Sequence, residues 1–114
     1  MKECLFCRII DKDVPSVEVF SNETVYAFED IEPVAPIHVL IVPRIHIENA
    51  SQLAREHNEI LFELFNAAQK IADIRGISSS GYRLIFNVGK DALNSVPHLH
   101  MHIIGGRQLE WPPG

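Results

Sequence analysis

The stretch His98-Leu99-His100-Met101-His102-Ile103-Ile104 alternates polar and apolar residues with a period of two. In a β-strand, side chains two positions apart point to the same side. The pattern therefore predicts a strand over His98–Ile104 in which Leu99, Met101 and Ile103 face the core. The three imidazoles then line the other side of that strand.

Three interpretations of this row of imidazoles are open. Side chains on one side of a strand lie roughly 6–7 Å apart, so the imidazoles depress one another's protonation and at least one stays neutral near pH 7. A neutral imidazole can act as a nucleophile, a base or a metal ligand. The row is then a histidine-rich solvated face, a metal-activated hydrolase centre, or a site of nucleophilic attack on phosphorus. Only six of the 114 residues are histidine, which disfavours the first reading.

The rest of the chain predicts an antiparallel α+β fold, because strands precede and follow one long helix. Apolar residues recur at helical spacing from Gln52 to Arg75. We expect further elements at a short helix over 4–10 and at strands over Val17–Phe20, Thr24–Phe28, Ile37–Val42 and Tyr82–Val88. Because linker-like composition is absent from the sequence, we expect one domain over residues 1–114.

Composition narrows the classes of partner. Ten Lys and Arg against fifteen Asp and Glu give a net charge of −5, which argues against a nucleic-acid-binding surface. No apolar run reaches the ~18 residues that cross a membrane. The first residues carry charge on both sides of a short apolar stretch, unlike a signal peptide, so we expect a cytoplasmic protein.

Cys4 and Cys7 form an isolated C-x-x-C pair. Two thiolates on one turn supply half of a zinc site, and zinc requires two further ligands. The spacing alone leaves three readings open: a zinc site, a redox pair, or two ordinary buried thiols.

Beyond the imidazole row, the chain resembles the histidine-triad (HIT) family over nearly its whole length. His98-x-His100-x-His102 matches the triad motif, and the Hint branch of the family is matched by the following segments: Leu5-Phe6…Ile9-Ile10, Ala27-Phe28-Glu29-Asp30-Ile31, Pro33-x-Ala35-Pro36-x-His38, Val42-Pro43-x-x-His46-Ile47, Gly81-Tyr82-Arg83, Asn87-x-Gly89, Ser95-Val96 and Gly105-Gly106-Arg107-Gln108-Leu109-x-Trp111-Pro112-Pro113-Gly114.

This resemblance implies a function and an assembly. Hint-branch proteins are homodimeric purine nucleoside phosphoramidases, which cleave a P–N bond to give AMP or GMP and an amine. Their antiparallel sheet continues across the dimer, and their catalysis needs no cofactor. The alternatives are a dinucleoside polyphosphate hydrolase of the same fold and a nucleotide-binding scaffold without significant turnover.

The resemblance also implies catalytic roles. His100 corresponds to the nucleophile that forms a nucleotidyl-histidine. His102 corresponds to a ligand of a non-bridging phosphate oxygen, while His98 and His38 correspond to residues that orient and protonate the nucleophile. Ser95 corresponds to a contact of the phosphate or the departing group.

The expected nucleotide-binding residues fall into two groups. On the phosphate side are the amide of Asn87 and the loop around Leu93, Asn94 and Ser95, where the family pattern is richer in glycine. On the nucleoside side, Asp30 would accept hydrogen bonds from the ribose hydroxyls, and an apolar slot for the purine would be formed by Phe6, Ile9, Phe28 and Ile31.

In some bacterial HIT proteins a cysteine pair is completed by two histidines. The matching positions here are His46 and His98. The resemblance therefore implies a closed structural zinc site of Cys4, Cys7, His46 and His98, separate from the chemistry.

Overall fold

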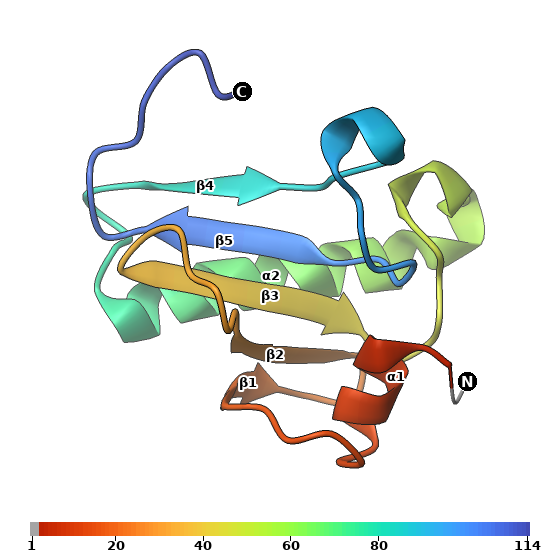
Figure 1. Cartoon of the computed structure of the whole chain (residues 1–114). Helices are drawn as coiled ribbons and strands as arrows, with labels where there is room; N and C mark the ends of the chain where they lie inside the picture. The colour runs from red at the N-terminus through yellow and green to blue at the C-terminus, as the bar shows by residue number, and fades with distance from the viewer. Residues whose placement is uncertain (1–2) are drawn as a thin grey trace.

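The structure, a computed structural model, describes residues 3–114. Met1 and Lys2, which contributed to the signal-peptide argument, lie outside this range. Five antiparallel strands form one sheet in the order β1-β2-β3-β5-β4 (Figure 1), which confirms the predicted α+β class. The strands are β1 (Glu18–Ser21), β2 (Val25–Glu29), β3 (Ile37–Pro43), β4 (Tyr82–Ile85) and β5 (Met101–Gly105).

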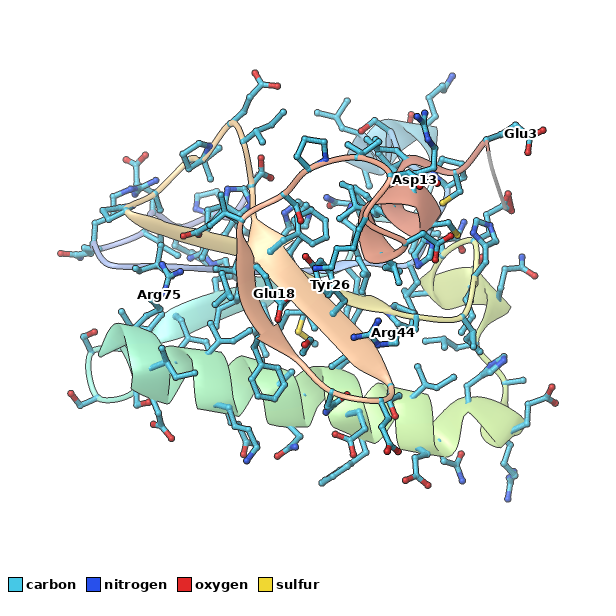
Figure 2. All side chains as sticks on the ribbon, turned by 90° about the horizontal axis from the view of Figure 1, so that it is seen from below. Glu3, Asp13, Glu18, Tyr26, Arg44 and Arg75 are labelled. Carbon is cyan, nitrogen blue, oxygen red and sulfur yellow. The ribbon has the colours of Figure 1, made fainter. Side chains whose placement is uncertain are left out.

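Two helices cover opposite faces of this sheet. The long helix α2 (Asn58–Arg75) runs along one face, and the short helix α1 (Leu5–Ile10) lies over the other. Figure 2 shows the sheet from its β1 side, with α1 above the strands and α2 below them. Each face therefore has its own apolar cluster.

Helix α2 forms the larger cluster because its apolar residues fall on one stripe. Leu64, Ala67, Ala68, Ile71 and Ala72 follow helical spacing, and each is at most 1% exposed. The three alanines let the helix backbone approach the sheet closely, where Met101 and Ile103 of β5 meet it as predicted.

The predicted start of the long helix at Gln52 was wrong. Two 3₁₀ turns, Ala50–Gln52 and Arg55–His57, precede the α-helix, and Ala54 between them is extended. The amide of Ala54 donates to Nδ1 of His57 at 2.9 Å, so this donor is satisfied by a side chain in the break between the two turns. The C-terminal end agrees with the prediction, with Gly76 in the left-handed region at φ 73°.

The predicted strand at His98–Ile104 was also too long at its start. It pairs with β3 only from Met101, opposite Ile41. Pro43, two residues beyond Ile41, has no amide to continue the ladder. The amide of Leu99 instead donates to the carbonyl of Ile47 at 2.6 Å. Strand β4 likewise ends at Ile85 rather than Val88.

Helix α1 is attached to the sheet through the segment that follows it. Lys12, in the left-handed region at φ 68°, ends the helical turn. Its Nζ donates to the hydroxyl of Tyr26 at 3.1 Å, and Ser16 Oγ lies 2.9 Å from the same oxygen. Tyr26 is 1% exposed and belongs to the cluster beneath α1, so these contacts help to fix α1 over β2 (Figure 2).

Within residues 3–114, neither helix has the length and apolar character needed to cross a membrane.

Ile71 and Ile74, two of the isoleucines of α2, give a matched test of this packing. Ile71 is fully buried and Ile74 is 61% exposed. We expect Ile71→Ala to lower the free energy of unfolding by about 3 kcal/mol, because it leaves a cavity against the sheet. Ile74→Ala should change it by less than about 0.5 kcal/mol. Urea unfolding of both variants at one protein concentration measures the difference, and equal losses would contradict the assigned helix face.

Candidate active site

The α1 side of the sheet carries His38 and the three histidines of the triad motif. His98 is fully buried, His38 on β3 is 5% exposed, and His100 and His102 are half-buried. The rings of His100 and His102 lie 5.1 Å apart, as do those of His38 and His102. The imidazole row is therefore not a solvated face.

The proton of neutral His100 has a defined position. Its Nδ1 lies 2.7 Å from the carbonyl oxygen of His98. A carbonyl can only accept, so Nδ1 carries the hydrogen and the lone pair of the neutral ring is on Nε2. Burial lowers the pKa of His100 below its ordinary value, which favours this neutral form.

His38 is hydrogen-bonded to His102, so the predicted support of His100 by His38 would act through His102, and that role stays a prediction. The amide of Val34 donates to Nδ1 of His38 at 3.1 Å, so the hydrogen of the neutral ring is on Nε2. That nitrogen lies 2.9 Å from Nδ1 of His102 and 3.2 Å from Oδ2 of Asp30. When His38 donates to His102, the hydrogen of His102 is placed on its own Nε2.

Burial also keeps His38 and His102 neutral. It lowers the pKa of His38, against the opposing effect of Asp30. For His102, burial and then the neighbouring imidazoles of His100 and His38 lower the pKa to about 4. The row thus consists of neutral imidazoles with defined tautomers near pH 7.

The segment between β4 and the triad carries the residues predicted on the phosphate side, of which Asn87 lies beside the imidazoles. The amide nitrogen of Asn87 lies 3.5 Å from Nε2 of His102. Asn94 has a buried side-chain oxygen without a hydrogen-bond partner in the described part of the chain. Ser95 is exposed, and Leu93 is 85% exposed in the left-handed region at φ 59°. This conformation explains why glycine suits the loop in the family pattern.

The structure buries three of the four residues predicted to hold the purine and leaves the fourth exposed. Phe6, Ile9 and Phe28 belong to the buried cluster under α1, with exposures of 4%, 6% and 4%, whereas Ile31 is 92% exposed. Phe6 packs edge-on against Phe28 at 5.4 Å and against His100 at 5.1 Å. The phenyl ring of Phe6 therefore forms an apolar wall beside His100.

The second cluster consists of the four residues proposed as zinc ligands. Nδ1 of His98 lies 3.2 Å from Sγ of Cys4 and 3.5 Å from Sγ of Cys7, and Nδ1 of His46 lies 3.5 Å from Sγ of Cys7. Zinc–sulfur and zinc–nitrogen bond lengths place neighbouring ligand atoms of a tetrahedral site about 3.5 Å apart. Nε2 of His98 lies 2.9 Å from the carbonyl of Pro43, the outer hydrogen bond typical of a metal-bound histidine. The donor set fits zinc.

The same geometry contradicts the reading in which three imidazoles share one ion. Nδ1 of His98 points to the two thiols and its Nε2 to Pro43, so this ring does not converge with His100 and His102. Asp30, His38 and His102 do bring potential ligand atoms within 4.8 Å of one another. The hydrogen that Val34 places on Nε2 of His38 disfavours metal binding at that nitrogen.

Two contributors to the site have no motif of their own. The amide of Val34 sets the tautomer of His38, and the carbonyl of Pro43 holds the ring of His98. Both are backbone groups, so their side chains carry no signal. The sequence offered one indication of their importance, since Val34 and Pro43 both lie within segments that match the family pattern.

Sequence similarity to known proteins identifies the family of this chain. A model of the HIT domain matches residues 11–109. The chain belongs to the HIT family. A purine nucleoside phosphoramidase of Escherichia coli K12 is 42% identical over 108 residues, covering 95% of this chain and 91% of that protein. The Arabidopsis thaliana adenylylsulfatase HINT1 is 39% identical over 112 residues, covering 96% and 76% respectively.

The HIT fold is equally clear in a solved structure. A HIT family hydrolase from Legionella pneumophila Philadelphia 1 superposes with a TM-score of 0.95 at 42% identity, covering 97% of this chain and 99% of that one. Together these matches identify the chain as a HIT-type nucleotide hydrolase.

The low pKa of His102 predicts a pH-dependent stability. Its pKa is about 4 in the folded chain against an ordinary 6.5, so the unfolded chain takes up this proton first as the pH falls. The contribution of neutral His102 to the free energy of unfolding is present above pH 6.5 and decreases as the pH falls from 6.5 to about 4. Between pH 7 and 5 the loss from this residue is about 2 kcal/mol.

His102→Asn removes this titration. Its free energy of unfolding should therefore fall by about 2 kcal/mol less than that of the wild type between pH 7 and 5. Urea unfolding at the two pH values checks this, and parallel losses in the two proteins would contradict the burial of a neutral His102.

Proposed function

We propose that the protein hydrolyses the P–N bond of purine nucleoside 5′-phosphoramidates, giving AMP or GMP and an amine through a nucleotidyl-His100 intermediate. The observation that carries the proposal is the 2.7 Å contact between Nδ1 of His100 and the carbonyl of His98. It directs the lone pair of a neutral imidazole away from the backbone, which is the state that a nucleophile requires.

The reaction proceeds by two displacements at the α-phosphorus. Nε2 of His100 forms a bond to phosphorus while the P–N bond of the substrate breaks. The departing nitrogen takes a proton from solvent and leaves as the amine, and His100 keeps its Nδ1 hydrogen in the phosphorylated ring. Water then attacks the same phosphorus and gives up its proton to solvent, while the His100–phosphorus bond breaks and its electron pair returns to Nε2 as the nucleotide is released. Imidazole is both a good nucleophile and a good leaving group, so one difficult displacement becomes two easier ones.

The phosphate is held without a basic patch. His102 presents the hydrogen on Nε2, placed there by the bond between its Nδ1 and His38. Asn87 and Ser95 add neutral donors, and the loop amides of Leu93–Ser95 extend this group. Neutral donors in a half-buried site stabilise the developing phosphoryl charge.

The nucleoside would be bound by Asp30 and by the apolar residues of and beneath α1. Oδ1 of Asp30 accepts the amide of Glu32 at 2.8 Å, which fixes the carboxylate in a tight turn. Its remaining lone pairs can accept both ribose hydroxyls. The purine would lie against exposed Ile31, with Phe6, Ile9 and Phe28 supporting the wall from beneath.

The names of the relatives support the nucleotide half of this substrate. One is a purine nucleoside phosphoramidase and another an adenylylsulfatase, so the two names differ in the group that leaves. The alternatives remain a dinucleoside polyphosphate hydrolase and a nucleotide-binding scaffold, and parallel rates on a phosphoramidate and a dinucleoside polyphosphate separate them.

A structural zinc ion is part of the proposal. Cys4, Cys7, His46 and His98 would hold it in a closed tetrahedral site, with no position left for substrate. Both cysteines are free thiols, as expected in the reducing cytoplasm that we propose as the location. When bound, the ion supplies cross-linking of α1 to the sheet, and catalysis at His100 needs no metal at the reacting atoms.

We further propose that two chains associate through β4 and α2. Strand β4 is an edge of the sheet, and unpaired edges invite strand pairing. Phe65 of α2 lies 6.3 Å from Phe86, one residue beyond β4, and it is exposed, as are Leu61 and Phe62 on the same helix. A homodimer would continue the sheet and bury these apolar side chains, as the family resemblance implies.

The nucleophile is tested by matched histidine variants. His100→Ala should lower kcat/KM for adenosine 5′-phosphoramidate by at least about a thousandfold, because no other group can carry the intermediate. His57→Ala, which removes an imidazole at the N-cap of α2, should retain wild-type turnover. An active His100→Ala protein would contradict the assignment.

The dimer is tested by charge in its proposed interface. Phe62 is 65% exposed, so Phe62→Glu leaves the chain folded but places a carboxylate in the interface. We expect the wild type to sediment at the mass of two chains and Phe62→Glu at that of one. Ile45→Glu, at a position 53% exposed in the segment after β3, should stay dimeric. Equal behaviour of the two variants would place the interface elsewhere.

A further inference from the structure

His98 is shared between the Cys/His cluster and the candidate active site. Its Nδ1 lies 3.2 Å from Sγ of Cys4, while its carbonyl oxygen accepts the hydrogen of His100 Nδ1 at 2.7 Å. The side chain and the backbone of one residue thus belong to two centres. A change in the position of the His98 ring is transmitted to the carbonyl that sets the tautomer of His100.

The backbone around His98 has little other support. Strand β5 begins at Met101, so residues 98–100 lie outside the paired ladder. The backbone bonds of this segment include those from the amide of His98 to Val96 at 2.8 Å and from the amide of Leu99 to Ile47 at 2.6 Å. The fully buried ring of His98, held at both nitrogens, is therefore a principal anchor of the carbonyl.

Helix α1 provides a second connection between the two centres. Cys4 caps this helix and Cys7 lies within it, and Phe6 between them packs at 5.1 Å from the ring of His100 and 6.0 Å from that of His98. A metal held by both cysteines would fix Phe6 against the nucleophile, and its loss would free the helix and the wall together.

We infer that a zinc ion in the cluster of Cys4, Cys7, His46 and His98 positions the nucleophile, so that metal loading sets the fraction of His100 in the reactive tautomer. Cys4, Cys7 and His46 are then positioning residues that act through His98. A neutral imidazole released from its carbonyl partner distributes its hydrogen over both nitrogens. Molecules with the hydrogen on Nε2 cannot attack phosphorus. The inference rests on the proposed role of His100 as nucleophile.

The test uses a spectroscopic and a kinetic measurement on the full chain. Zinc is removed with a chelator under reducing conditions, and long-range ¹H–¹⁵N spectra report which nitrogen of His100 carries hydrogen. His46→Gln weakens the cluster at a ligand that has no contact with His100, and His57→Gln is the matched control. Zinc content, kcat and KM for adenosine 5′-phosphoramidate are measured on the same samples.

We expect one zinc equivalent per chain and a single Nδ1–H tautomer of His100 in the loaded wild type and in His57→Gln. The stripped wild type and His46→Gln should show a mixture of tautomers and a kcat lowered about tenfold, with KM changed less than twofold. Added Zn²⁺ should restore the wild type. A purely structural metal would alter thermal stability but leave both the tautomer and kcat of the folded protein unchanged.

The inference is overturned if His100 keeps its Nδ1–H tautomer and kcat in the folded metal-free protein, or if the purified chain holds less than a tenth of an equivalent of zinc. Should stripping unfold the wild type, His46→Gln decides on the same two measurements. If the loaded wild type does not cleave the phosphoramidate, the proposed function fails, while the tautomer comparison still decides whether the cluster positions His100.

Discussion

The hydrogen bond from Nδ1 of His100 to the carbonyl of His98 is the constraint on which the site depends. A histidine in water has no fixed tautomer, and a nucleophile needs a lone pair at one defined atom. Here the chain folds back on itself over two residues, and a backbone group makes the choice. The neighbouring imidazoles follow the same logic, since the amide of Val34 fixes His38, and His38 in turn fixes His102.

The two faces of the sheet have different roles. One face carries the main apolar core, and the other carries the candidate site. The α2 face is closed by small and branched apolar side chains. The α1 face carries the histidines, with a smaller apolar cluster and the Cys/His group beneath the helix. Pro43 links the sheet to the candidate site. It ends the pairing of β3 with β5, and its carbonyl oxygen accepts a hydrogen bond from Nε2 of His98. The interruption of the strand therefore creates the geometry of the site.

Periodicity predicted the parts of this structure that depend on alternation. Leu99, Met101 and Ile103 face the core, and the spacing from Leu64 to Ala72 gives the buried stripe of α2. Strand and helix ends were predicted less well, since Ala54 and Leu99 obtain their hydrogen bonds from partners outside the regular element. Contacts between distant segments, such as Cys4 with His98, came from the family resemblance. The backbone roles of Val34 and Pro43 have no sequence signature, because any residue carries the same carbonyl and nearly any the same amide.

The most direct test of the account is to trap the covalent intermediate. Adenosine 5′-phosphoramidate is mixed with the enzyme and quenched within one turnover, and the digested protein is sequenced by tandem mass spectrometry under conditions that preserve phosphorus–nitrogen bonds. The account predicts one adenylyl group per reacting site, on His100. A label on His102 or Ser95, or turnover with no labelled residue, would contradict the central role of the His100–His98 hydrogen bond.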